Sequence, residues 1–327
     1  PLIVMAPPLP NTFFPFIVGK AIYTHTLIEI AVGMWVLLAM RDSGYRPPRS
    51  WLLPIFVVYV VLVLLASLFG VSPQRSIWST YERMQGFVDV AHWLAFVIVV
   101  SSVYRSWIEW RALLNFNLCI SVVMAMLGLG QRYDIQVLGY LTSTERVDIT
   151  LGNPTYVGAY MLVNILIALG FLGHSLMKPT VVVTESVLKS RHRRRRSRRA
   201  PSGTEFPWVS SLRIFWVSAI VLDTIILYMS GTRGAVVGLA GGIVAFSIGY
   251  MIWGRDRRIK FVATFLLSSV VGLILLFVAV RGHPSFDQIS QSSVMLSRLS
   301  NIGPNDESVA GRVNSALVGL HGFVARP

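Results

Sequence analysis

The stretch KSRHRRRRSRR at residues 189–199 carries eight lysines and arginines in eleven positions and lies between two long apolar segments. A segment with this charge density cannot enter the hydrocarbon of a bilayer, and short basic loops of membrane proteins stay on the cytoplasmic side. The stretch therefore predicts in which direction each neighbouring apolar segment crosses a membrane.

The composition of the whole chain is that of a membrane protein. Of its 327 residues 54% are hydrophobic and 13% are charged, and the mean hydropathy is +0.62. A soluble domain carries about 25% charged residues. Apolar runs of about 20 residues recur, which is enough to cross hydrocarbon as helices and too long and continuous for barrel strands. We predict an all-α integral membrane protein, a polytopic helical bundle with about eight transmembrane helices. The expected spans are about 14–40, 51–71, 87–103, 110–130, 155–177, 208–229, 234–253 and 260–280.

The connections between these spans alternate in charge. Every second connection is rich in arginine or lysine and is assigned to the cytoplasm, whereas the others are closer to neutral and are assigned to the outer face, the periplasm of a Gram-negative cell. The basic connections are 41–50, 104–111, 178–207 and 255–260, and the outer ones are 72–86, 131–154, 230–233 and the tail after 281. The first span must then run inward, so we expect a further helix before Pro1.

The net charge of +14 comes largely from the 178–207 loop. An arginine run can bind nucleic acid. A topology signal that also touches anionic lipid headgroups explains the same charge, and we prefer it, predicting no nucleic-acid partner. The loop's composition predicts disorder.

Six ionisable residues fall inside the expected spans, where such groups are costly and therefore informative. His25 and Glu29 are four residues apart and can pair on one helix face, or each can bond to another helix. A proton relay is the alternative to such structural bonds. The six are Lys20, His25, Glu29, Asp89, His92 and Asp223.

Arginines also gather in the outer connections. Arg233 sits in the tight turn SGTRGA (230–235), ahead of glycines at 234, 238 and 242 whose spacing predicts close helix packing. A guanidinium at the start of a helix favours phosphate, although an arginine can also reach toward lipid headgroups. Arg146 lies just before the Gly-Asn-Pro turn at 152–154. Other outer candidates are Glu82, Arg83, Asn153, Arg298 and Arg312.

Four motifs, taken in order, resemble those of the O-antigen ligase and polymerase superfamily of bacterial membrane glycosyltransferases. They are FIVGK (16–20), STYERMQG (79–86), LGNPTYVG (151–158) and SGTRGA (230–235). The tail at 282–327 resembles the beginning of that family's large periplasmic loop, and 1–281 would be the transmembrane bundle. The likeness covers nearly the whole chain.

The resemblance implies transfer of a glycan from a polyprenyl (undecaprenyl) diphosphate carrier to an acceptor hydroxyl at the periplasmic face of the inner membrane. The acceptor may be a core sugar of lipopolysaccharide, a growing polysaccharide or a protein. The reaction implied is inverting and needs no cofactor and no metal. The expected partners are the lipid-linked glycan, its glycan or lipid acceptor, and the bilayer.

The resemblance also implies residue roles. Arg233 and Arg312 match arginines that act on the diphosphate in the family, and they are the predicted catalytic residues. The family's basic histidine is expected beyond Pro327, and we do not transfer its role to His283 or His321. The predicted substrate-binding residues are Arg146, Arg83, Glu82, Asn153 and Arg298.

Two alternatives to the enzyme remain open. A transporter would use the ionisable residues inside the spans and predicts broken helices that meet near the membrane midplane. No pair of Gly- or Pro-interrupted helices in corresponding positions supports it. The second alternative is a non-catalytic subunit of a membrane assembly.

Overall fold

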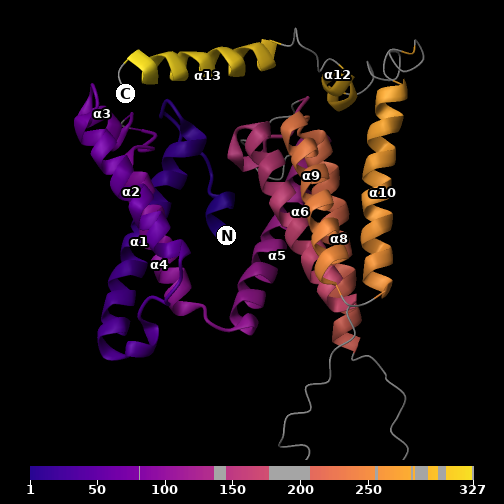
Figure 1. The fold of residues 1–327 in the computed structure, drawn as a ribbon, viewed down its shortest axis with the longest axis horizontal. Helices are drawn as coiled ribbons and strands as arrows, with labels where there is room; N and C mark the ends of the chain where they lie inside the picture. Colours follow the sequence, from indigo (N-terminus) through magenta and orange to yellow (C-terminus); the bar gives the residue numbers. More distant parts are fainter. Residues whose placement is uncertain are drawn as a thin grey trace, which may run out of the picture. The chain divides into compact units, whose positions relative to one another are not determined.

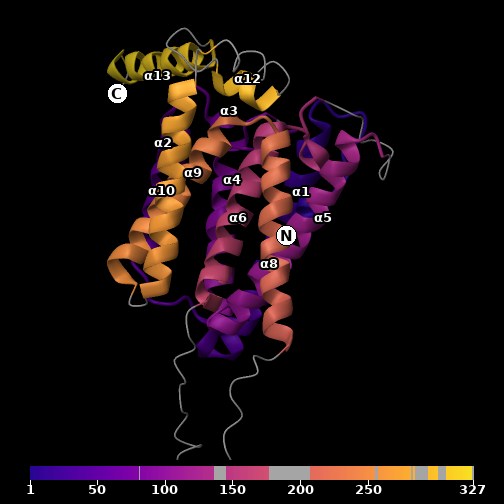
Figure 2. The same cartoon turned by 90° about the vertical axis from the view of Figure 1, so that its right-hand side faces the viewer.

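The computed structural model of the chain describes residues 1–80, 82–135, 145–176, 207–254, 257–280, 283, 294–300 and 307–325. Regular structure within these ranges is helical throughout, without a strand. The predicted loop at 178–207 lies outside the described residues except for its last position, where a helix begins. Helices appear as coiled ribbons in Figure 1, and Figure 2 gives the view at right angles.

The helices occupy the predicted apolar runs, so the all-α polytopic fold is confirmed. Seven are long and apolar enough to cross a membrane, and α4, also apolar, is shorter at 17 residues. Seventeen residues are at the lower limit for a span. The seven are α1 (Pro15–Arg41), α2 (Leu52–Phe69), α5 (Trp107–Arg132), α6 (Pro154–Leu176), α8 (Pro207–Met229), α9 (Arg233–Trp253) and α10 (Arg257–Val280), and α4 is Phe87–Val103.

Large apolar side chains remain exposed along several of these helices. Leu52 and Phe69 of α2 are 77% and 86% exposed, and Leu273 of α10 is 65% exposed. Such surfaces would be unfavourable in water, but hydrocarbon solvates them. These faces are therefore suited to contact with lipid tails.

The chain divides into two compact units, with α5 beginning in the first and ending in the second. In the first unit α4 packs against both α1 and α2, and α1, α2 and α4 run side by side in Figures 1 and 2. Shorter elements complete this unit. They are η1 (Leu2–Met5), η2 (Ser43–Tyr45), α3 (Pro73–Trp78) and η3 (Ile149–Leu151).

In the second unit α6 packs against α8 and α9, and α10 lies beside α9. The predicted glycine face of α9 accounts for part of this packing. A Cβ atom on Gly238 would lie 3.0 Å from Leu162 of α6, and one on Gly242 would lie 2.8 Å from Leu166. Gly234 meets nothing within 4 Å, so the predicted face is confirmed at two of its three positions.

The two ends of this unit are distinct. At one end Arg213 of α8 donates a hydrogen bond to the carbonyl oxygen of Ser175 in α6, at 2.8 Å. The connection between α6 and α8, which contains the basic stretch, therefore departs from this end. At the other end α8 turns into α9, and the short helix α12 (Val294–Ser300) packs on both. The turn with Arg233 and the basic connection thus belong to opposite ends of the same helices.

Candidate functional site

The turn between α8 and α9 is built by backbone geometry that requires a glycine. Gly231 has φ +60°, in the left-handed region, and its N–H donates to the carbonyl oxygen of Tyr228 at 3.0 Å. The Thr232 hydroxyl donates to the Pro154 carbonyl at 3.0 Å, which ties the turn to the start of α6. Arg233 follows as the first residue of α9, so its backbone position is fixed on both sides.

Arg146 is held against this turn. Its Nε donates to the carbonyl oxygen of Ser230 at 2.9 Å, and the N–H of the next residue, Val147, donates to Met229 at 3.3 Å. A Cβ atom on Gly231 would lie 3.2 Å from Arg146 Nε, which is tighter than ordinary contact. The absence of a side chain at position 231 therefore makes room for the Arg146 guanidinium.

A third arginine joins from α12. Arg233 Nη1 donates to the carbonyl oxygen of Arg298 at 3.1 Å. We call Arg146, Arg233 and Arg298 the arginine cluster. All three were predicted as site residues from the sequence, and residues from three distant parts of the chain meet here in one unit.

The arginine cluster is electropositive. Burial lowers the pKa of Arg146, and the nearby charge of Arg298 lowers it further. An arginine nevertheless stays protonated at neutral pH. The hydrogen bonds to Ser230 and Arg298 end on carbonyl oxygens, which carry no formal charge and do not neutralise the guanidinium groups. An anion near Arg146 and Arg298 would relieve their repulsion, and guanidinium geometry suits phosphate.

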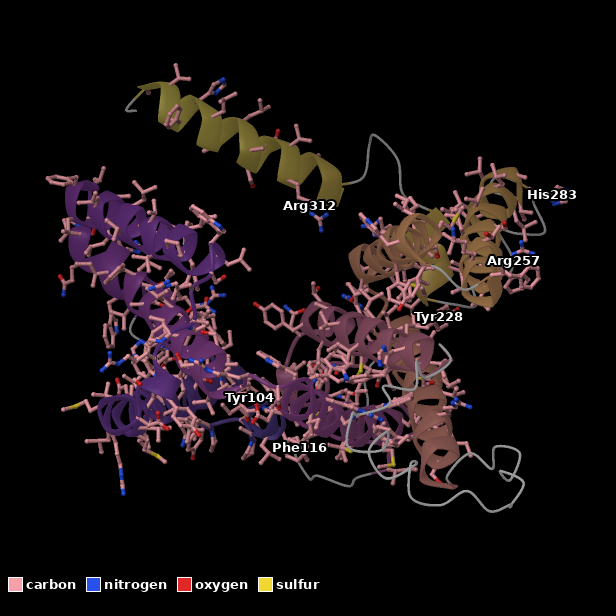
Figure 3. The ribbon with its side chains drawn as sticks, turned by 60° about the horizontal axis from the view of Figure 1, so that its bottom comes forward. Tyr104, Phe116, Tyr228, Arg257, His283 and Arg312 are labelled. Atoms are coloured by element: carbon pink, nitrogen blue, oxygen red, sulfur yellow. The ribbon has the colours of Figure 1, made fainter. Side chains whose placement is uncertain are left out.

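A pocket of about 570 Å³ lies in the same unit. This volume is within the usual range for small-molecule sites. Tyr228 at the end of α8, labelled in Figure 3, belongs to its wall. Its lining consists of Arg132, Tyr133, Glu145, Tyr228, Met229, Val294 and Met295.

Sequence reasoning did not single out the residues of this pocket. Arg132 and Tyr133 end α5, Glu145 precedes Arg146, and Tyr228 ends α8. Their common signal is position, because each lies at a helix end in a connection that was assigned to the outer face. Nothing in the sequence shows that these connections come together.

Arg312 is placed differently from the arginine cluster. It lies on α13 (Glu307–Ala325), whose side chains from position 310 to 325 are all exposed. Figure 3 shows Arg312 projecting from this helix. Its predicted catalytic role stays a prediction.

The remaining predicted residues belong to the first unit. Glu82 Oε2 accepts a hydrogen bond from the backbone N–H of Phe14 at 2.9 Å, and Arg83 lies over the Phe14 ring, 5.1 Å from its centre. Both side chains thus hold the start of α1. Asn153 is exposed and directly precedes α6.

Lys20 connects two of the sequence motifs within the first unit. Its Nζ donates to the carbonyl oxygens of Ala6, Phe16 and Thr150, the last at 2.6 Å. Gly152, with φ +64°, leaves no room for a Cβ atom, which would lie 2.3 Å from the Phe16 ring. The first and third motifs therefore contact one another, and Lys20 is used to bind backbone.

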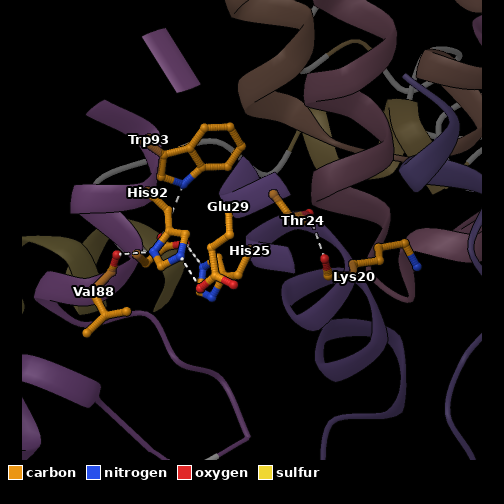
Figure 4. A network of polar contacts seen from close by, with 8 residues as sticks. Lys20, Thr24, His25, Glu29, Val88, His92 and Trp93 are labelled. Carbon is orange, nitrogen blue, oxygen red and sulfur yellow. Dashed lines mark hydrogen bonds and ion pairs between the residues drawn. The ribbon is translucent and has the colours of Figure 1, made fainter. Parts of the chain in front are cut away.

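The other ionisable residues of α1 and α4 form the network drawn in Figure 4. His25 Nε2 lies 3.0 Å from Asp89 Oδ1, and His92 Nε2 lies 3.2 Å from Glu29 Oε1. The two imidazole rings stack with centres 4.2 Å apart. We call His25, Glu29, Asp89 and His92 the α1–α4 network. Each histidine pairs with a carboxylate of the other helix, which confirms bonding between helices over pairing of His25 with Glu29.

Two further contacts close this network. His92 Nδ1 lies 2.7 Å from the carbonyl oxygen of Val88, and Trp93 Nε1 donates to Asp89 Oδ2 at 3.3 Å. The groups thus satisfy one another across the helix pair, as polar residues between membrane helices commonly do. Among the described residues no cluster of three or more His, Cys, Asp or Glu is arranged to hold a metal ion.

The fold and the site define a class: a polytopic α-helical membrane protein with a basic site at the turn between two spans. Residues 218–327 match the family model described as O-antigen ligase. The match covers the last third of the chain, includes the α8–α9 turn, and confirms the resemblance drawn from the motifs; the chain thus carries a domain of the O-antigen ligase family. Comparison with curated proteins and with solved structures gave no match.

Proposed function

We propose that the chain belongs to an enzyme that transfers a glycan from a polyprenyl diphosphate, such as undecaprenyl diphosphate, to an acceptor hydroxyl at the outer face of the bacterial inner membrane. The observation that carries the proposal is the convergence of Arg146, Arg233 and Arg298 beside the α8–α9 turn. The family match supports a lipid-linked glycan as substrate and a bilayer as the setting.

The chemistry requires stabilisation of a leaving group. The bond between the sugar's anomeric carbon and the diphosphate oxygen breaks, and the acceptor oxygen bonds to that carbon while its proton passes to a general base. Negative charge grows on the departing diphosphate. Fixed guanidinium groups stabilise this charge more in the transition state than in the ground state. In this proposal Arg233 and Arg146 bind the diphosphate, and Arg298 adds to the positive potential.

The sidedness of the second unit supports an outer active face. The α8–α9 turn and the connection that holds the basic stretch belong to opposite ends of the α6–α8–α9 bundle. Basic connections stay in the cytoplasm. The arginine cluster is therefore assigned to the periplasmic end.

A transporter fits the structure less well. Its motivation was the ionisable residues of α1, but His25 and Glu29 pair with residues of α4, and Lys20 donates to backbone carbonyls. The described helices run without the interruption near mid-span that a transport site predicts.

The test is replacement of Arg233 by Ala in the full-length protein, with Arg257→Ala as its matched control. Arg257 begins α10 and so lies at the far end of α9 from Arg233 (Figure 3). We expect Arg233→Ala to lower transfer from the lipid-linked glycan about 100-fold, as for loss of one charge-stabilising donor. Arg257→Ala is expected to leave transfer within about twofold of the parent. Equal activity of the two variants would remove Arg233 from the mechanism.

A further inference from the structure

The pocket beside the arginine cluster is made from the same three segments as the cluster. Tyr228 and Met229 line it and directly precede the turn that carries Arg233. Glu145 lines it and directly precedes Arg146. Val294 and Met295 line it from α12, within one helical turn of Arg298.

Two backbone and side-chain contacts fix this arrangement. The Val147 N–H bonds to Met229, and Arg146 Nε bonds to Ser230, so the segment that begins with Glu145 is attached to the end of α8. A Cβ atom on Gly231 would lie 3.2 Å from Arg146 Nε and 3.5 Å from Val294 Cγ1. Val294, a wall of the pocket, and Arg146 thus flank the same glycine. Whatever binds the arginine cluster has the pocket next to it.

The lining identifies the chemistry of an occupant. Glu145 offers a carboxylate that accepts hydrogen bonds, Arg132 offers donors, and Tyr133 and Tyr228 offer phenol groups that do both. The tyrosine rings, with Met229 and Met295, add apolar surface. A ligand with many hydroxyls and apolar C–H faces matches this combination of groups.

The same lining argues against the other parts of a lipid-linked glycan. An isoprenoid tail would remove Glu145 and Arg132 from water without offering them a hydrogen bond, which is costly for charged groups. A second phosphate would meet the negative charge of Glu145. A sugar pairs with both residues and carries no charge that either would repel.

Resting on the function proposed above, we infer that this pocket binds the sugar nearest the diphosphate of the lipid-linked glycan, with Glu145 accepting hydrogen bonds from its hydroxyls. Glu145 is then a specificity residue that contacts substrate. The arginine cluster reads the diphosphate, which is common to all such carriers, and the pocket reads the glycan.

The experiment compares two probes on the full-length protein in lipid nanodiscs. The first is lipid-linked glycan extracted from host cells that lack this gene, and the second is undecaprenyl diphosphate without a sugar. We expect the parent protein to bind the first probe about tenfold more tightly, which corresponds to about 1.4 kcal/mol. The variant Glu145→Gln should lose most of that tenfold while its affinity for undecaprenyl diphosphate is unchanged.

Two further variants control for structure. Asp134→Asn changes a carboxylate of the same connection that does not line the pocket, and asparagine suits the left-handed backbone there (φ +57°), so both affinities should stay as in the parent. Tyr228→Phe removes one phenol and should weaken only the glycan-linked probe, by about threefold.

The outcomes separate this inference from the proposed function. If the parent protein binds neither probe, the function itself is wrong. If it binds both and Glu145→Gln with Tyr228→Phe change neither affinity, or lower both equally, the pocket is not the sugar site while the diphosphate site stands. Selective loss of the glycan-linked probe in Glu145→Gln, with Asp134→Asn unchanged, supports the inference.

Discussion

The α1–α4 network and the arginine cluster both place ionisable side chains in or beside membrane helices, and they satisfy those side chains in opposite ways. In the network each histidine meets a carboxylate at 3.0–3.2 Å, so positive and negative groups are matched. In the cluster, arginines lie close enough to repel one another, and carbonyl oxygens hold Arg146 and Arg233 in place. Matched charges hold two helices together, whereas gathered like charges prepare a site for a ligand of the opposite sign.

The largest effect should come from the arginine cluster. Arg146→Ala removes a charge and the Nε bond to Ser230, and we expect transfer to fall about 100-fold. Arg146→Lys keeps the charge but cannot place two donors on a phosphate, so a fall of about tenfold is expected. Transfer rates per folded molecule measure both. His25→Ala in the network provides the contrast, and a comparable loss of transfer there would end the distinction between the two regions.

A smaller effect is expected from the turn that positions the cluster. Gly231→Ala costs about 1–2 kcal/mol because an L-residue is forced into the left-handed region, and its Cβ presses on Arg146. We expect transfer to fall about tenfold. Gly234→Ala is the matched control, since a Cβ there meets nothing within 4 Å. Steady-state transfer assays on the two alanine variants should separate them; identical rates would mean that the turn does not position Arg146.

The network should respond in stability and not in transfer. Asp89→Ala removes the acceptor of both His25 and Trp93, and interhelical hydrogen bonds of membrane proteins are worth up to about 1–2 kcal/mol. We expect the free energy of unfolding in detergent to fall by about that amount, with transfer per folded molecule unchanged. Glu29→Gln should cost less, because the Glu29 side chain is 67% exposed. A loss of transfer without loss of stability would give the network a functional role.

The smallest effect should be that of salt. Raising ionic strength from about 0.1 M to 1 M shortens the screening length from about 10 Å to about 3 Å. Binding of undecaprenyl diphosphate to the partly exposed arginine cluster should weaken by about threefold, while the unfolding midpoint, which depends on the network inside the bilayer, should stay constant. Calorimetric titration and thermal unfolding at the two salt concentrations measure the pair.

Much of the fold follows from the sequence because helix length and apolar composition are local properties. The runs at 51–71 and 260–280 became α2 and α10, and Ser230-Gly231-Thr232-Arg233 became the turn that its glycine predicts. Arg146, Arg233 and Arg298 could be named in advance, because arginines in outer connections are few.

The pocket could not be predicted in the same way. It depends on Glu145, Tyr228 and Met295 meeting, and that meeting is decided by the packing of α6, α8, α9 and α12. Likewise, the four-residue spacing of His25 and Glu29 allowed a bond within one helix, but the packing of α4 against α1 gave each a partner across the interface. Contacts of this kind are properties of the assembled helices, and a single sequence does not encode them visibly.

The contact of His92 with the Val88 carbonyl fixes how many protons the adjoining pair holds. A carbonyl oxygen only accepts, so His92 Nδ1 carries a hydrogen, and the second contact, from Nε2 to Glu29, needs one more. That hydrogen belongs either to an imidazolium facing a carboxylate or to a carboxylic acid facing an imidazole. In both forms the pair has zero net charge, which is how two titratable groups can be carried on the bilayer-crossing part of the chain at small electrostatic cost.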